Sequence, residues 1–265
     1  MSQPHINPNS DQGAAQTPVQ PDYLDHDGAR LAFHRTDGHG PMVIWCGGLK
    51  SDMDGTKAVF LEERCAAAGQ AFIRFDYFGH GKSDGEFTDG TVSRWASDVT
   101  AMIDRYGTGG TVLIGSSMGG WAALLAAIDR PDSVKGLVLI NPAPDFTEKM
   151  VWAGWDEHKR QMLIEDGIVY EPSDYDEPYA YSRALIEDGR ARQILDAPIA
   201  VSGPVEILQG ADDLVVPPAH SALIPDRLES DQVGYTLVKG GDHSLSRPDD
   251  LDRLWSALKT VIAKL

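Results

Sequence analysis

The chain alternates short, mainly apolar runs with longer segments whose apolar residues recur at helical spacing. A short apolar run bounded by turn residues is typical of a strand that is buried on both faces. Strands of this kind, separated by helices, form mostly parallel sheets. We therefore predict an α/β fold, with a mostly parallel sheet flanked by helices and strands at 42–45, 71–75, 111–114, 136–140, 205–208 and 234–238.

The intervening segments carry the pattern of helices. Segments 57–68, 92–106 and 251–265 place their apolar residues on one face, as expected of helices that cover a sheet. Segment 121–128 is apolar on every side, which is typical of a helix buried between two layers. Near the N-terminus, Asp27-Gly28 lies between two strand-like segments and predicts a β-hairpin at one edge of the sheet.

The alternation of strands and helices breaks between residues 142 and 202. This stretch is rich in Trp and Tyr, carries mixed charge and contains helical patches such as 148–164, but it shows no convincing buried strand. We interpret 142–202 as a helical cap inserted into a single α/β domain that spans 22–265. Residues 1–21 have no apolar core and are expected to form a disordered tail, and a further helix is predicted at 219–228.

The charge of the chain narrows the classes of partner. With 40 acidic and 23 basic residues the formal net charge is −17, which disfavours binding to nucleic acid and to anionic lipid. No apolar stretch approaches the ~18 residues of a membrane span, so no integral membrane association is expected. Residues 1–20 contain no Lys or Arg, and the only cysteines are Cys46 and Cys65. These features favour a cytoplasmic protein without a secretory signal.

A candidate nucleophile follows the strand predicted at 111–114. Gly115, Ser117 and Gly119 fit the G-x-S-x-G pattern of a nucleophile elbow, in which a serine projects from a tight turn between strand and helix. Larger side chains two positions before or after the serine would collide with that strand and helix. The turn strains the serine backbone, and the helix N-terminus directs N–H groups towards developing negative charge. The alternative interpretation is an ordinary turn between strand and helix in a nucleotide-binding sheet, which needs neither a base nor an acid. The presence of a base and an acid would therefore favour the nucleophile elbow.

Candidates for both groups follow the last two predicted strands. A serine hydroxyl becomes an effective nucleophile when a histidine takes its proton and a carboxylate orients that histidine. Asp212 and Asp213 follow one strand and His243 follows the next, so their loops are expected to open on the same edge of the sheet as Ser117. Adjacent aspartates point in different directions, and spacing alone leaves the choice between them open.

Two backbone donors are expected to stabilise the tetrahedral intermediate. One is the N–H of Met118, directly after the serine, and the other comes from the small-residue loop at Gly48 in preference to Leu49. Among the remaining histidines, His80 is predicted to be structural or to lie at the rim of the site. His220 is predicted to lie on a helix surface.

These residues resemble the α/β-hydrolase superfamily of serine hydrolases. More narrowly, the chain is similar to the mitochondrial palmitoyl-protein thioesterases, a group also described as acyl-glucuronide esterases. The similarity runs from about Gly47 to the C-terminus, thins through the predicted cap, and is carried by segments 55–58, 73–77, 79–85, 115–121 and 212–217.

The resemblance implies an α/β-hydrolase fold with a helical lid and a catalytic triad of Ser117, Asp213 and His243. It implies a small-molecule acyl ester or thioester as substrate, and neither cofactor nor metal. Acyl transfer, C–C bond hydrolysis and perhydrolysis could use the same three residues, and a non-catalytic ligand-binding module could use the same scaffold. Acyl length, the preference between ester and thioester, and the oligomeric state are left open.

Overall fold

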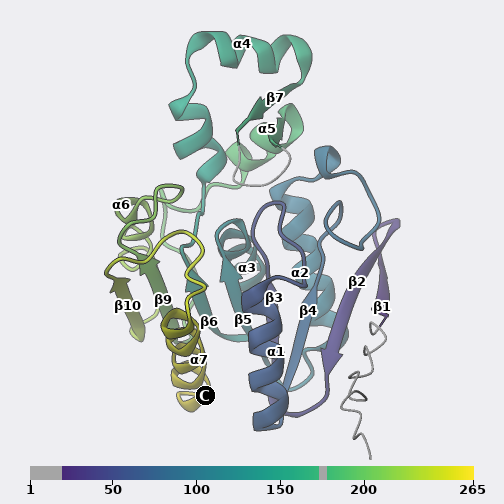
Figure 1. Ribbon diagram of the computed structural model, residues 1–265, viewed down its shortest axis with the longest axis vertical. Helices are drawn as coiled ribbons and strands as arrows, with labels where there is room; N and C mark the ends of the chain where they lie inside the picture. The colour runs from purple at the N-terminus through teal and green to yellow at the C-terminus, as the bar shows by residue number, and fades with distance from the viewer. Residues whose placement is uncertain (1–19, 173–177) are drawn as a thin grey trace, which may run out of the picture.

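A computed structural model of the protein describes residues 20–172 and 178–265. Within these residues, eight strands form one sheet in the order β1-β2-β4-β3-β5-β6-β9-β10 (Figure 1). In this sheet β2 pairs antiparallel with β1 and β4 and the other five pairs are parallel, so the predicted mostly parallel sheet is confirmed. The strands are β1 (Asp22–His26), β2 (Ala29–Thr36), β3 (His39–Cys46), β4 (Gln70–Phe75), β5 (Thr111–Ser116), β6 (Val134–Ile140), β9 (Val205–Gly210) and β10 (Val233–Val238).

Helices cover both faces of this sheet, as predicted. Helices α1 (Thr56–Ala68) and α7 (Pro248–Ala263) lie on one face, and α2 (Val92–Tyr106) and α3 (Met118–Asp129) lie on the other (Figure 1). Successive residues of a strand point to opposite faces and so enter different cores. In β5, Val112 and Ile114 pack in the cluster that contains α1 and α7, whereas Leu113 packs in the cluster that contains α2 and α3.

The helices and strands of the predicted cap, from η2 to α5, lie beyond the carboxyl ends of the sheet strands (Figure 1). The single helix expected at 148–164 is instead divided into a π-helical turn and α4, because Asp156 caps a new helix by accepting a hydrogen bond from the Lys159 N–H. The cap also contains an antiparallel strand pair that the sequence pattern did not indicate. Its strands are too short to show a clear period. The cap elements are η2 (Thr147–Trp152), α4 (Glu157–Asp166), β7 (Ile168–Glu171), β8 (Tyr179–Ser182) and α5 (Arg183–Ala191).

Two further predictions concern the helix at 219–228 and the N-terminal tail. The helix expected at 219–228 is wrong in extent, because only α6 (Pro218–Ser221) is helical. Pro225 lacks an N–H and cannot continue a helix, so the chain proceeds in turns. The tail predicted at 1–21 lies outside the described residues except for positions 20 and 21.

Among the residues that the structure describes, no helix is both long and apolar enough to cross a membrane. Cys46 and Cys65 are free and buried. The remaining short element is the 3₁₀ turn η1 (Phe87–Asp89), in the loop after β4.

Candidate active site

Ser117 occupies a strained turn between β5 and α3. Its backbone angles are φ 54° and ψ −122°, in a region that a residue with a side chain rarely adopts. Its N–H donates to the carbonyl of Ile140 at 2.9 Å, which ties the turn to the neighbouring strand β6. A Cβ at Gly115 would collide with the Gly119 backbone, and one at Gly119 would collide with the carbonyls that precede the loop at Gly48. The glycines of the motif are therefore sterically required.

His243 and Asp213 form a hydrogen-bonded pair. The Nδ1 atom of His243 lies 2.8 Å from Oδ2 of Asp213, and the other carboxylate oxygen accepts the N–H groups of Val215 and Val216, each at 2.8 Å. Asp213 is 3% exposed, whereas the side chain of Asp212 points to solvent. A carboxylate offers only acceptors, so Nδ1 carries the proton and Nε2 is free to accept one. The structure thus brings Asp213, and not its neighbour, to the histidine.

Ser117 and His243 line one cavity of about 740 Å³ between the sheet and the cap. Within the described part of the chain, no hydrogen bond joins the serine hydroxyl to the imidazole. Such bonds are often long or poorly aligned until a substrate is bound. The apolar residues of its lining include several from the cap: Ala143, Phe146, Met150, Val151, Tyr179 and Tyr181. The polar residues of its lining include Ser51, Asp52, Thr56, Lys57, Ser244 and Ser246.

Both predicted oxyanion donors adjoin the serine. Met118 is the first residue of α3, where the N–H groups have no partner within the helix. Gly48 also lines the cavity, and a Cβ placed on it would stand 3.5 Å from that of Ser117. The carbonyl of Gly48 accepts both the N–H and the hydroxyl of Ser51, at 3.2 and 2.8 Å, which fixes the orientation of the loop. Leu49 lines the same cavity, so both candidates for the second donor adjoin the site.

Asn141 is a structural member of this site that the sequence reasoning missed. It is fully buried at the end of β6, with φ 43°. Its Nδ2 donates to the carbonyls of Asp242 and His243 at 3.1 and 2.8 Å, while its Oδ1 accepts the Gly210 N–H at 2.7 Å. One side chain therefore joins the loop of the acid to the loop of the base. The sequence signal was a single amide directly after a buried apolar strand.

Lys57 also holds the loop that carries His243. Its Nζ donates to the carbonyl of Ser244 and lies 3.4 Å from the hydroxyl of Ser246. Burial lowers the pKa of this amine to about 8. Gln209 contacts the loop that carries Asp213: its Nε2 donates to the carbonyls of Gly210 and Val216. The roles of Lys57 and Gln209 could not be expected from sequence spacing.

The two other histidines considered from the sequence, His80 and His220, lie outside the pair. His80 is 4% exposed among aromatic rings, in keeping with a structural position. His220, expected on a helix surface, is half-buried, and its Nε2 lies 2.7 Å from the carbonyl of Pro144. Burial lowers the pKa of His220 from its usual value.

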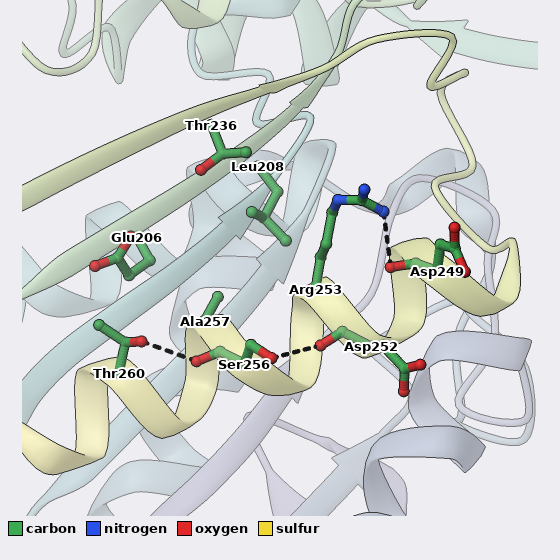
Figure 2. A pocket seen from close by; sticks show the side chains of 9 residues that line it. All are labelled: Glu206, Leu208, Thr236, Asp249, Asp252, Arg253, Ser256, Ala257 and Thr260. Atoms are coloured by element: carbon green, nitrogen blue, oxygen red, sulfur yellow. Dashed lines mark hydrogen bonds between the residues drawn. The ribbon is translucent and has the colours of Figure 1, made fainter.

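A second hollow, of about 490 Å³, lies between α7 and the strands β9 and β10 (Figure 2). It shares no lining residue with the cavity beside Ser117. Several of its polar groups already bond along the helix: Ser256 donates to the carbonyl of Asp252, and Thr260 donates to that of Ser256 (Figure 2). We interpret it as a surface groove.

The parallel sheet, the serine elbow and the acid and base loops at one sheet edge define the class of α/β hydrolases. The chain belongs to this family of hydrolytic enzymes. Residues 40–165 match the family described as serine aminopeptidase, S33.

Similar proteins and solved structures indicate a narrower group within the α/β hydrolases. The chain is 37% identical over 237 residues to the mitochondrial palmitoyl-protein thioesterase ABHD10 of Bos taurus, covering 89% of this chain and 77% of that protein. A solved structure of the mouse α/β hydrolase domain-containing protein 10 has a TM-score of 0.85 and 34% identity, covering 93% and 99% of the two chains. A putative hydrolase from Agrobacterium vitis S4 has a TM-score of 0.88 and 39% identity, covering 93% and 100%.

Proposed function

We propose that the protein is a serine hydrolase that cleaves carboxylic esters or acyl thioesters through an acyl-enzyme on Ser117. The observation that carries this proposal is the placement of Ser117, at a strained elbow, in one cavity with a histidine already paired to a buried carboxylate. The relatives named as thioesterases support the choice of an acyl substrate.

In the acylation step, His243 acts as general base. Its Nε2 accepts the proton of the Ser117 hydroxyl as the oxygen attacks the acyl carbonyl carbon. Asp213 holds the ring in the tautomer that leaves Nε2 unprotonated, and its charge stabilises the imidazolium that forms. The N–H of Met118 and a second N–H from Gly48 or Leu49 stabilise the oxyanion. When the C–O or C–S bond breaks, the imidazolium returns the proton to the departing alcohol or thiol.

Deacylation repeats the same proton transfers with water. His243 takes a proton from the attacking water, a second tetrahedral intermediate forms, and its collapse returns the proton to Ser117 and releases the carboxylic acid. The three residues therefore end each turnover in their starting protonation states. The ring needs one orientation throughout, and the pair with Asp213 provides it.

The lining of the cavity favours an apolar acyl chain. The acyl group is placed against the side formed by Phe146, Met150 and Tyr181, where burial of apolar surface contributes about 25 cal/mol per Å². The leaving group then lies next to the polar lining residues Lys57 and Ser244. Because the apolar wall comes mainly from the cap, the cap is proposed to select the acyl chain.

A fluorophosphonate probe tests the nucleophile directly. We expect the probe to label wild-type protein at Ser117, and Ser117→Ala to be neither labelled nor active on p-nitrophenyl acyl esters. Ser256→Ala, which removes an exposed serine hydroxyl on α7 outside this cavity, is the control and retains both properties. Labelling at another residue, or unchanged turnover by the Ser117 variant, would contradict the proposal.

Matched esters and thioesters of increasing acyl length then define the substrate. Products formed in the presence of competing alcohols, amines or peroxide distinguish hydrolysis from acyl transfer and perhydrolysis. A protein that binds acyl compounds without turning them over would instead be a binding module. The cytoplasmic location stays a prediction, since the relatives are named as mitochondrial. Fractionation of cells that produce the full chain tests it.

A further inference from the structure

His80 lies in the loop that follows β4, outside the cavity that holds Ser117. The residue is 4% exposed, and its ring meets the rings of Tyr77, Phe87 and Trp95 edge-on, with centroids 5.2 to 5.6 Å apart. An aromatic residue would satisfy this packing as well as a histidine does. The choice of histidine therefore points to its nitrogen atoms.

Both ring nitrogens of His80 have backbone partners. Nδ1 lies 3.1 Å from the carbonyl of Phe78, and Nε2 lies 3.2 Å from the N–H of Lys50. A carbonyl only accepts and an N–H only donates, so Nδ1 carries the proton and Nε2 accepts. Burial lowers the pKa of His80 to about 4, which keeps the ring neutral and able to accept at neutral pH.

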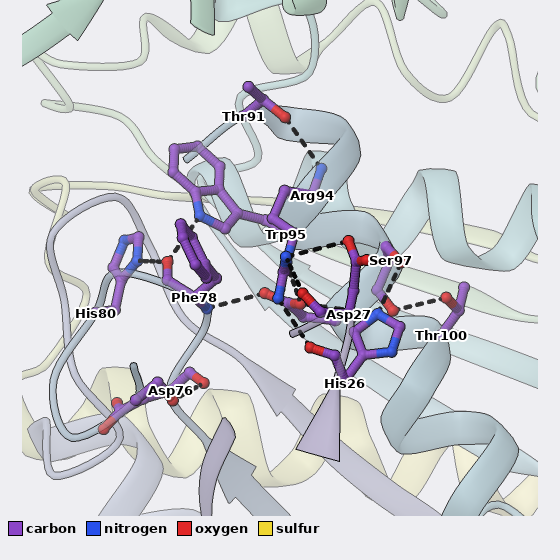
Figure 3. Close-up of polar contacts among 12 residues, drawn as sticks. His26, Asp27, Asp76, Phe78, His80, Thr91, Arg94, Trp95, Ser97 and Thr100 are labelled. Carbon is purple, nitrogen blue, oxygen red and sulfur yellow. Dashed lines mark hydrogen bonds and ion pairs between the residues drawn. The ribbon is translucent and has the colours of Figure 1, made fainter. Parts of the chain in front are cut away.

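The carbonyl that orients His80 is itself anchored to α2 (Figure 3). The indole N–H of Trp95 donates to the same Phe78 carbonyl at 3.2 Å, and the Phe78 N–H donates to Asp98 at 2.9 Å. Asp98 in turn accepts from the Nε of Arg94 at 3.0 Å. Because a long core helix fixes Phe78, the ring of His80 has a rigid support.

The partner of the other nitrogen belongs to the loop beside the nucleophile. Lys50 has φ 59°, a left-handed conformation that costs about 1 kcal/mol or more in a residue with a side chain, so it needs external support. Two residues earlier, Gly48 lies against Ser117, and its carbonyl accepts from Ser51. The loop between Gly48 and Ser51 is thus held at Lys50 by a side chain from a different part of the chain.

We propose that His80 is a positioning residue for the oxyanion hole: by accepting the Lys50 N–H, it holds the loop at the distance from Ser117 at which Gly48 or Leu49 donates to the oxyanion. This inference rests on the proposed serine hydrolase mechanism. The expected effect is specific: displacing an oxyanion donor reduces the stabilisation of the transition state, and so kcat. Ground-state binding in the cavity is little changed.

Two polar substitutions that differ by one methylene group test the proposal. His80→Asn reaches the Phe78 carbonyl but stops short of the Lys50 N–H, whereas His80→Gln is long enough to accept from it. We expect kcat of His80→Asn to fall about 10- to 100-fold, while its KM stays within about threefold of wild type. Removing an oxyanion donor lowers kcat by about 10²–10³-fold, and displacing the donor is expected to cause part of that loss. His80→Gln is expected to recover kcat to within about fivefold of wild type.

Tyr77→Phe is the matched control, because it alters a ring that packs edge-on against His80 but leaves both hydrogen bonds of the His80 ring in place. We expect its kcat to stay close to wild type. All assays are run well below the lowest Tm, and inhibition by a trifluoromethyl ketone, which forms a tetrahedral adduct, is measured alongside. This inhibition is expected to weaken in parallel with kcat in the Asn variant.

The outcomes separate the two proposals. Unchanged kcat and inhibition in His80→Asn, or equal losses in the Asn and Gln variants, overturn the role of His80 while Ser117-dependent turnover of the wild type still stands. Absence of Ser117-dependent turnover in the wild type overturns the proposed function itself. If His80→Asn does not fold, His80→Phe preserves the aromatic packing and removes the same acceptor.

Discussion

Asn141→Leu removes the side chain that joins the loops of Asp213 and His243. The substitution keeps the number and branching of the side-chain heavy atoms, and Asn141 does not line the cavity. It deletes all three hydrogen bonds of the buried amide and leaves two carbonyls and one N–H without that partner. We therefore expect the substitution to lower the stability of the protein and to disturb the placement of His243.

The structure sets the size of the expected loss. Each hydrogen bond contributes about 1 kcal/mol net, so three contribute about 3 kcal/mol. Asn tolerates φ 43° better than Leu does, which adds roughly 1 kcal/mol of backbone strain. The free energy of unfolding is thus expected to fall by about 4 kcal/mol. A shift of the His243 loop by about 1 Å would lower kcat by about 100-fold.

Urea denaturation measures the first effect, and steady-state kinetics on p-nitrophenyl esters, at a temperature where the variant is folded, measure the second. Thr111→Val is a control, because the hydroxyl of Thr111 on neighbouring β5 is buried without a hydrogen-bond partner among the described residues. Removing that hydroxyl should leave stability and kcat within about 0.5 kcal/mol and twofold of wild type. A change of less than about 0.5 kcal/mol in Asn141→Leu, with wild-type kcat, would refute the reasoning.

Three further predictions concern the acid, the elbow and the pH dependence of stability. Asp213→Asn should lower kcat by about 10⁴ by favouring the wrong histidine tautomer, while Asp212→Asn stays near wild type; the reverse result would exchange their assignments. Gly119→Ala should destabilise the protein by about 3 kcal/mol, because its Cβ meets neighbouring carbonyls, whereas Gly154→Ala, with open space around it, should change Tm little. Burial raises the pKa of Asp98 to about 6, so the folded protein holds this proton more tightly than the unfolded chain does. As the pH falls from 7 to 4, wild type should therefore gain up to about 3 kcal/mol over Asp98→Asn, and a pH-independent difference in unfolding free energy would contradict this.

Local pattern was sufficient to predict the framework of the site. Apolar runs separated by amphipathic segments required a parallel sheet with two covered faces, and the loops after β5, β9 and β10 then had to open on one edge. The small residues around Ser117 indicated the turn because their steric need is local to that turn. The same local reasoning failed at the cap strands β7 and β8, which are too short to show a period and pair only with each other.

The sequence by itself determined the elbow at Gly115 to Gly119 and the order in which the candidate nucleophile, acid and base follow the strands. Only the tertiary structure decided which aspartate faces His243, because that depends on the path of the loop after β9, where Asp213 is held by the N–H groups of Val215 and Val216. It alone also revealed the contacts of Asn141 and His80. Both side chains bond to backbone groups far away in the sequence, and no spacing along the chain records which N–H and C=O groups packing brings within their reach.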